Sequence, residues 1–161
     1  MRPSRESVRQ TGQSYFVSSQ TAYRRPFFRH ERWAQLFLHT LESYRAAYLL
    51  HAYVLMPDHV HLLLTPKDSL EKAVQQIKGG FSYRAKKELN WQGEVWQKGF
   101  SDHRIRDNVD WENHLEYIRM NPVKAKLCTD PNEYPYGFQR GPLVMDEVPQ
   151  RPPCAQDELQ R

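Results

Sequence analysis

The hydrophobic and polar positions of the chain switch between strand-like and helix-like patterns along its length. Residues 15–19 predict a first strand. Residues 31–48 place large apolar side chains at helical spacing, which predicts a helix; these are Trp33, Leu36, Phe37, Leu41 and Tyr44. The run at 49–56 is almost continuously apolar, which is typical of a strand whose two faces are both covered.

A second helix is predicted after Ser69, which is a suitable N-cap. Its apolar face consists of Leu70, Ala73, Val74 and Ile77. We expect the glycine pair at 79–80 to interrupt this helix and a second helical piece to continue to Leu89. Short strands or extended segments are then predicted at 94–98 and 101–106.

The last long helix is predicted to begin at Asp107 or Asn108, either of which can cap it. Its apolar stripe has the spacing of one helix face and consists of Trp111, Leu115 and Ile118. Because a proline disfavours helical geometry in the residue before it, Pro122 should place Asn121 at the helix end or just beyond it. The helix is therefore expected to stop near residue 120.

The order of these elements predicts an α+β fold, a ferredoxin-like or RRM-like antiparallel sheet with helices packed on its faces. We expect a flexible arm at 1–13, a single domain at 14–140 and a proline-rich, disordered tail at 141–161. No apolar run approaches the length of a membrane span, and the first residues lack the apolar core of a secretion signal. A cytoplasmic location, with association to the nucleoid when DNA is bound, is the resulting expectation.

Two histidines stand out in the apolar stretch at 52–66, which reads AYVLMPDHVHLLLTP. Strand residues two apart share a face, so His59 and His61 should project together, with the aliphatic residues between and after them turned toward a core. Two imidazoles on one rigid strand supply part of a metal site, because neutral imidazole is a common ligand for divalent metals. The alternative is a pair of half-exposed strand histidines without a ligand.

Positive charge is concentrated in the folded part of the chain. The net charge is +4, the tail from 141 carries a net −2, and residues 1–140 therefore carry +6. This excess suits a polyanionic partner such as nucleic acid. Candidate DNA-binding residues lie in two aromatic-containing segments, and they are Arg24, Arg25, Lys78, Arg84, Lys86 and Lys87. A solvated basic surface is the alternative interpretation.

Several motifs together resemble one family. MPDHVHLLLTP is followed some fifty residues later by HLEYIRMNPVKAKL, and RRPFF, KGGFSYR and WQKGFSDHRIRD lie in between or before. In this combination the chain resembles the REP-associated tyrosine transposases, within the single-tyrosine, insertion-sequence-type branch of the His-hydrophobic-His (HUH) transposases. The resemblance covers about residues 14–136.

The resemblance implies a transposase that cuts single-stranded, hairpin-forming DNA through a 5′-phosphotyrosine intermediate. It implies Tyr117 as the nucleophile and His59, His61 and Asn121 as ligands of Mg²⁺ or Mn²⁺. Tyr117 and Asn121 are four residues apart, so they share a helix face. One position departs from the family pattern: this chain has Arg119 where relatives often carry a histidine. The resemblance also implies a monomer, although related enzymes include homodimers.

Three other functions remain compatible with the sequence. The first is a metal-independent, RRM-like nucleic-acid-binding protein in which the histidines only line a surface. The second is a zinc hydrolase, which is disfavoured because no further His/Asp cluster follows closely behind His61. The third is a degenerate relative that keeps the motif and binds DNA but does not transpose.

Overall fold

The structure is a computed structural model that describes residues 12–149. Four antiparallel strands form one sheet in the order β2-β3-β1-β4, with β1 at Tyr15–Gln20, β2 at Tyr48–Met56, β3 at His59–Pro66 and β4 at Ser101–Arg104. Three helices accompany them, namely α1 at Glu31–Ser43, α2 at Leu70–Glu88 and α3 at Asn108–Lys124. This succession of elements confirms the predicted ferredoxin-like α+β class.

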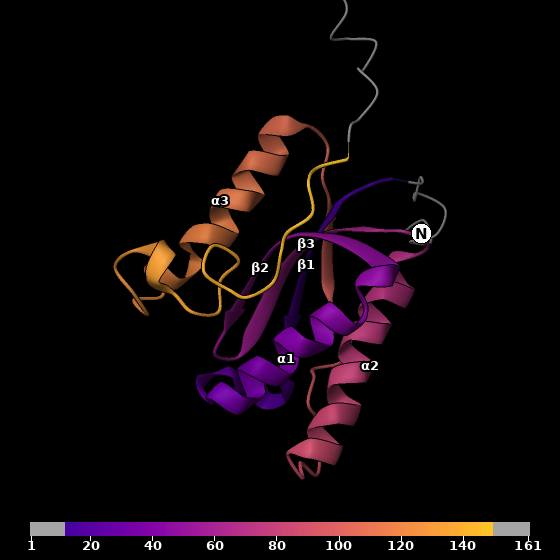
Figure 1. Ribbon diagram of the computed structural model, residues 1–161, viewed down its shortest axis with the longest axis vertical. Coiled ribbons are helices and arrows are strands. Elements are labelled where there is room, and N and C mark those ends of the chain that lie inside the picture. Colours follow the sequence, from indigo (N-terminus) through magenta and orange to yellow (C-terminus); the bar gives the residue numbers. More distant parts are fainter. Residues whose placement is uncertain (1–11, 150–161) are drawn as a thin grey trace, which may run out of the picture.

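The three helices divide between the two faces of the sheet. Figure 1 shows α1 and α2 on one side and α3 on the other. The α1/α2 face buries the larger core, in which aromatic side chains from both helices meet those of the loop at 20–30. The α3 face buries a smaller cluster around Trp111 and Ile118. Each face is thus covered, as the apolar run of β2 predicted.

Alternation along β3 assigns its side chains to these two faces. Val60, Leu62 and Leu64 belong to the core beneath α1 and α2, and Leu63 belongs to the cluster beneath α3. The strand pairs antiparallel with β2 after the tight connection at 57–58. The predicted direction of the aliphatic residues is therefore confirmed.

The first helix is shorter than predicted, since α1 ends at Ser43 and a turn of 3-10 helix at Arg45–Ala47 follows it. Tyr44 lies beyond the helix, and its ring packs against α2 at Gly80. A Cβ at Gly80 would lie 2.5 Å from Cε2 of that ring. The prediction that glycines at 79–80 break the helix is wrong, because α2 is continuous and Gly80 instead permits this close approach.

The last helix is longer than predicted. Asp107 caps it through a hydrogen bond from the backbone N–H of Asp110, but the helix continues through Pro122 to Lys124. Pro122 is buried and extends the apolar stripe by one turn beyond Ile118. Burial of the proline ring offsets the missing backbone hydrogen bond, so Asn121 lies inside the helix and not at its end.

Of the two strands predicted between α2 and α3, one forms. Ser101–Arg104 pairs with β1, whereas the segment at 94–98 contributes only an isolated bridge between Trp96 and Thr21. Two backbone hydrogen bonds hold this segment against the end of β1, from Ala22 to Val95 and from Gln97 to Gln20. It packs as a loop over the sheet end.

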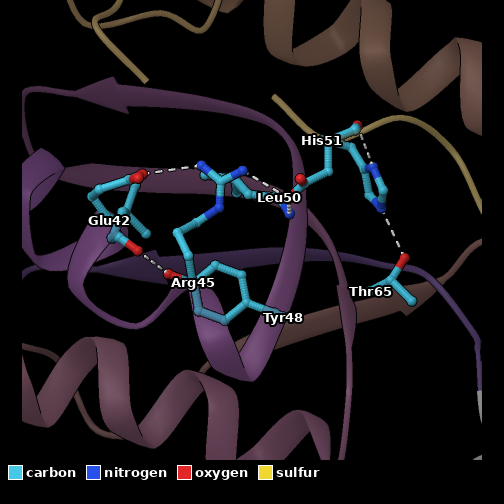
Figure 2. A network of polar contacts seen from close by, with 8 residues as sticks. Glu42, Arg45, Tyr48, Leu50, His51 and Thr65 are labelled. Atoms are coloured by element: carbon cyan, nitrogen blue, oxygen red, sulfur yellow. Dashed lines mark hydrogen bonds and ion pairs between the residues drawn. The ribbon is translucent and has the colours of Figure 1, made fainter. Parts of the chain in front are cut away.

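The beginning of the predicted tail is hydrogen-bonded to β2 at Leu50 and His51, which Figure 2 labels. Asp146 accepts hydrogen bonds from Arg45 at 2.7 Å and from the backbone N–H of Leu50 at 2.9 Å. Its carbonyl accepts from Nδ1 of His51 at 2.8 Å, and Nε2 of His51 bonds to Thr65 at 2.8 Å. Residues 141–149 thus have a defined place in the fold, unlike the disorder predicted for them.

The described residues begin near the end of the predicted arm, of which 1–11 lie outside them, as do residues 150–161 of the predicted tail. Between 12 and 149, no helix has the length and apolarity needed to cross a membrane.

Candidate active site

His59 and His61 lie side by side on the sheet face that α3 covers. Their ring centroids are 4.8 Å apart, and the planes cross at 75°. His61 is 6 % exposed, whereas His59 is half-buried at the start of β3. The prediction that the two imidazoles project together is met by this geometry.

His61 is held in a pocket of apolar and hydroxyl groups. Its Nδ1 lies 2.6 Å from the hydroxyl of Ser18 on the neighbouring strand, and its ring stacks on Phe16 with 5.2 Å between centroids. Burial, together with the nearby His59, lowers the pKa of His61 to about 3. The imidazole is therefore neutral near pH 7, and its buried Nε2 has no hydrogen-bond partner among the described residues.

His59 is oriented by a carboxylate. Its Nδ1 donates to Oδ1 of Asp58 at 2.7 Å, and Oδ2 of the same residue accepts from Nε of Arg24 at 2.9 Å. Although burial acts in the opposite direction, these hydrogen bonds and charges lower the pKa of Asp58. Because the carboxylate holds the proton on Nδ1, Nε2 of His59 keeps a lone pair that can bind a metal. Metal-binding histidines in proteins commonly donate their other ring N–H to a carboxylate in this way.

Tyr117 reaches the histidines from the opposite element, α3. Its ring lies 5.3 Å from that of His61, centroid to centroid, and 5.7 Å from that of Phe16. The residue is 42 % exposed, so it is accessible from solvent. The ammonium of Lys124 lies 5.6 Å from the ring centroid. Helix α3 thus brings a phenol beside two imidazoles that are more than fifty residues away in sequence.

Asn121 lies one helical turn beyond Tyr117 and is half-buried. The rings of His59, His61 and Tyr117 form a continuous series of contacts. Because α3 continues past Pro122, the backbone of Asn121 is helical and its carbonyl accepts from the N–H of Ala125 at 3.0 Å. Its side-chain amide shares the helix face of Tyr117.

The six predicted DNA-binding residues separate into two places. Arg24 and Arg25 lie in the loop that hydrogen-bonds to the turn at 57–58, directly before His59. The other four lie on α2, across the sheet from Tyr117. Of these, Lys78 donates to the carbonyls of Gln97 and Gly99, while Lys86 and Lys87 are exposed.

Arg84 contacts the Tyr44 ring, with its guanidinium carbon 5.5 Å from the ring centroid. Lys78 and Arg84 therefore have roles inside the fold. On the other side of the sheet, Arg119 pairs with Glu116 through two hydrogen bonds. This pairing orients the arginine along α3.

A second polar cluster beside Tyr117 had not been predicted as a site. His103 on β4 and His114 on α3 both contact the carboxylate of Asp110. The spacing of Asp110 and His114, four residues apart on a helix, was the available signal. His103 could not be joined to them from the sequence, because its position depends on how β4 pairs with β1.

Comparisons with known proteins agree with this geometry. A chain bound to a REP hairpin, described as a REP-associated tyrosine transposase, has the same fold with a TM-score of 0.71 at 21 % identity, over 90 % of this chain and 95 % of its own. At this level of identity the match establishes a similarity of fold and nothing further.

Two curated sequences are similar to about half of the chain. A Haemophilus influenzae protein named among the REP-associated tyrosine transposases is 33 % identical over 97 residues, covering 53 % of this chain and 55 % of its own length. The REP-associated tyrosine transposase of Escherichia coli is 29 % identical over 90 residues, covering 54 % and 52 %. The matched part thus spans about half the length of these relatives. The sequence model of the family described as "Transposase IS200 like" matches residues 11–121.

Proposed function

The chain belongs to the family of IS200-like transposases, and on this basis we propose that it cleaves and rejoins single-stranded DNA through a phosphotyrosine at Tyr117. The observation that carries the proposal is the packing of the Tyr117 ring against His61, 5.3 Å between centroids, with His59 directly beside. A nucleophile next to two imidazoles is the arrangement that metal-assisted phosphoryl transfer needs.

The donor set fits a divalent ion. His59 is fixed with Nε2 free, His61 has a buried Nε2 without a partner among the described residues, and the Asn121 amide could add an oxygen donor from the same helix face as Tyr117. Mg²⁺ and Mn²⁺ accept such a mixture when water and substrate phosphate complete the shell. When bound, the ion would withdraw charge from the scissile phosphate.

The chemistry at Tyr117 requires no nucleotide cofactor. The phenol oxygen forms a bond to phosphorus, the bond from phosphorus to the 3′ oxygen breaks, and the phenol proton is transferred to that 3′ oxygen. The product is a 5′-phosphotyrosine and a free 3′-OH. Because a phosphodiester is exchanged for a phosphodiester, a second 3′-OH can reverse the step and join a new strand.

The surroundings of His59 suit unpaired DNA. Arg25 lies 5.0 Å from the centroid of the Tyr23 ring and 5.2 Å from that of Trp91, and Tyr23 is 78 % exposed. Flat side chains interleaved with guanidinium groups can stack unpaired bases and contact their phosphates. Arg24 connects this surface to His59 through Asp58. We place the strand that leaves the cleavage site along this path.

We further propose that the substrate is a hairpin with single-stranded flanks, in keeping with the REP hairpin bound by the structural relative. Exposed Lys86 and Lys87 on α2 would contact a more distant part of such a DNA. Lys78 and Arg84 would contribute only through atoms that their contacts inside the fold leave available. The chain acts as a monomer in this scheme, because Tyr117 and His61 come from one copy.

The test uses an oligonucleotide hairpin with single-stranded flanks, labelled at either end, and its fully paired counterpart. With Mg²⁺ or Mn²⁺, we expect a covalent adduct on a denaturing gel that carries the label downstream of the cut, and no adduct with the paired duplex or with a chelator. Binding without any adduct would favour an RRM-like binding protein or a degenerate relative. Equal cutting of hairpin and duplex would overturn the single-strand specificity.

A further inference from the structure

Three side chains at the start of α3 converge on one point outside the contacts of the Tyr117 site. Nε2 of His103 lies 2.8 Å from Oδ2 of Asp110, and Nδ1 of His114 lies 3.1 Å from Oδ1 of the same residue. Among residues 12–149, this is the one group of three His, Cys, Asp or Glu side chains whose potential ligand atoms all lie within 4.8 Å of one another.

Helix capping explains Asp110 but not the two histidines. Asp110 accepts a hydrogen bond from the backbone N–H of Arg106 at 2.9 Å and donates its own N–H to the N-cap Asp107 at 2.8 Å. The rings of His103 and His114 come from different elements and stack with 4.6 Å between centroids and 16° between planes. Each ring directs one nitrogen at the same carboxylate.

We propose that His103, Asp110 and His114 form a second metal site, which binds a transition-metal ion of the Zn²⁺ class. Two imidazoles and one carboxylate form a donor set that Zn²⁺ uses in proteins. Ligand atoms on one tetrahedral zinc lie about 3.4 Å apart, given bonds of about 2.0–2.1 Å. The distances from the two imidazoles to the carboxylate, 2.8 and 3.1 Å, are shorter than this, so the histidines would move slightly away from Asp110 to admit the ion.

The cluster is accessible to an ion from solvent. The side chains of His103, Asp110 and His114 are 36 %, 18 % and 23 % exposed, which leaves room for a water molecule as fourth ligand. Binding would displace protons, since His114 donates its Nδ1 proton to the backbone carbonyl of Asp110 in the metal-free arrangement. Affinity should accordingly fall as the pH is lowered.

The consequence of a bound ion would be a link between β4 and the start of α3. That helix carries Tyr117, and the Phe16 ring contacts both His114, at 4.9 Å, and Tyr117, at 5.7 Å. The ion would thus act as a structural clamp on the helix that presents the nucleophile. This site does not rest on the proposed DNA cleavage and can be tested without DNA.

The experiment uses the full chain carrying His59→Ala and His61→Ala, which removes the other histidine pair. Titration with Co²⁺ should produce a d–d absorption band with a stoichiometry of one ion per chain, and Zn²⁺ should displace the Co²⁺. Adding His103→Ala to this background should weaken Zn²⁺ binding at least tenfold in competition with a chromophoric chelator. The matched control is His39→Ala, which changes an exposed histidine on α1 and should leave binding unchanged.

Asp110→Asn provides a second variant and should also weaken binding. If it disturbs the helix cap enough to unfold the chain, His103→Ala decides, because His103 lies outside the cap and its removal is monitored by circular dichroism. Zn²⁺ should raise the melting temperature of the His59→Ala/His61→Ala chain and not that of the chain lacking His103 as well. The proposal is overturned if the double variant binds no Zn²⁺, or if losing His103 leaves the affinity where it was.

Discussion

The two faces of the sheet are built from the same strands but carry different kinds of side chain. Beneath α1 and α2, the Phe81 ring alone is surrounded by four aromatic rings, with centroids 5.2 to 6.0 Å away. Beneath α3, the same strands present His61, His51 and Thr65, whose polar atoms are buried. One face excludes water through packing, and the other keeps polar groups in defined orientations.

This difference shows how a small domain separates stability from chemistry. Because strand residues alternate between faces, β3 contributes Val60 and Leu62 to the apolar core while His59 and His61 remain available on the other side. A buried polar group is costly without a partner. On the α3 face, Nε2 of His61, which has no hydrogen-bond partner within residues 12–149, carries this unfavourable free energy of burial. The apolar packing of the α1/α2 face stabilises the fold and offsets it.

The largest effect on the α3 face should come from Tyr117→Phe. The ring keeps its contacts with His61 and Phe16, but the attacking oxygen is gone, so covalent adduct formation should be abolished while DNA binding persists. Adduct is measured on denaturing gels and binding by fluorescence anisotropy. The matched control is Tyr83→Phe, which removes a hydroxyl from an exposed tyrosine on α2 and should leave the adduct unchanged. An adduct in the Tyr117 variant would mean that another residue is the nucleophile.

The largest effect on the opposite face should be one of stability. Phe81 is fully buried, and Phe81→Ala should lower the free energy of unfolding by about 3–5 kcal/mol through lost burial and a residual cavity. Leu115→Ala, at a partly buried position beneath α3, should cost less. Urea unfolding followed by circular dichroism measures both. A greater loss for Leu115→Ala would contradict the division between a packing face and a chemical face.

Much of this division could be predicted from sequence, because alternation and helical spacing are local. The pairing of His59 with His61, the cap at Asp107 and the apolar face of α2 follow from spacing alone. The continuity of α3 through Pro122 could not be predicted, since no local pattern shows that the proline is buried in the fold. The continuity of α2 at Gly80 could not be predicted either, since the close approach there is to the ring of Tyr44, which is distant in sequence.

Roles of residues that depend on tertiary contacts also could not be predicted from the sequence. The charge of α2 predicted DNA contacts equally for four of its basic residues, but Lys78 donates to loop carbonyls and Arg84 contacts an aromatic ring. The cluster of His103 with Asp110 and His114 requires the register of β4 on β1, which no local pattern specifies. Strand spacing predicted that His59 and His61 project together, and the family resemblance implied Tyr117 as the nucleophile, whereas the surroundings of these residues depend on pairing across the sheet.

A smaller effect should follow from pH. Burial lowers the pKa of His51, although its hydrogen bond to Asp146 acts in the opposite direction. The unfolded chain then binds the proton more readily, so stability is complete above the ordinary histidine pKa of about 6.5 and is lost as the pH falls below it. One such group gives a slope of at most about 1.4 kcal/mol per pH unit.

The measurement is urea unfolding between pH 7.5 and pH 5.0 with a chelator present. His51→Gln should lower stability at pH 7.5, because the bonds to Asp146 and Thr65 are disturbed, and should flatten the dependence on pH. The control is His39→Gln on the surface of α1, which should change neither quantity. An unaltered slope in the His51 variant would assign the acid sensitivity to other groups.

The smallest change in structure, and the sharpest test of the proposed metal site, is Asn121→Ala. Because Asn121 lies inside α3 and does not terminate it, alanine is the better helix former there and should leave stability unchanged or raise it by up to about 0.7 kcal/mol. If the amide is a ligand, cleavage should nevertheless require more Mg²⁺, with partial rescue by Mn²⁺. The two readouts are thermal unfolding and a metal titration of adduct formation. A metal titration curve that coincides with that of the unchanged chain would leave His59 and His61 as the protein ligands, because a residue that only extends the helix has no means of altering metal affinity without altering the fold.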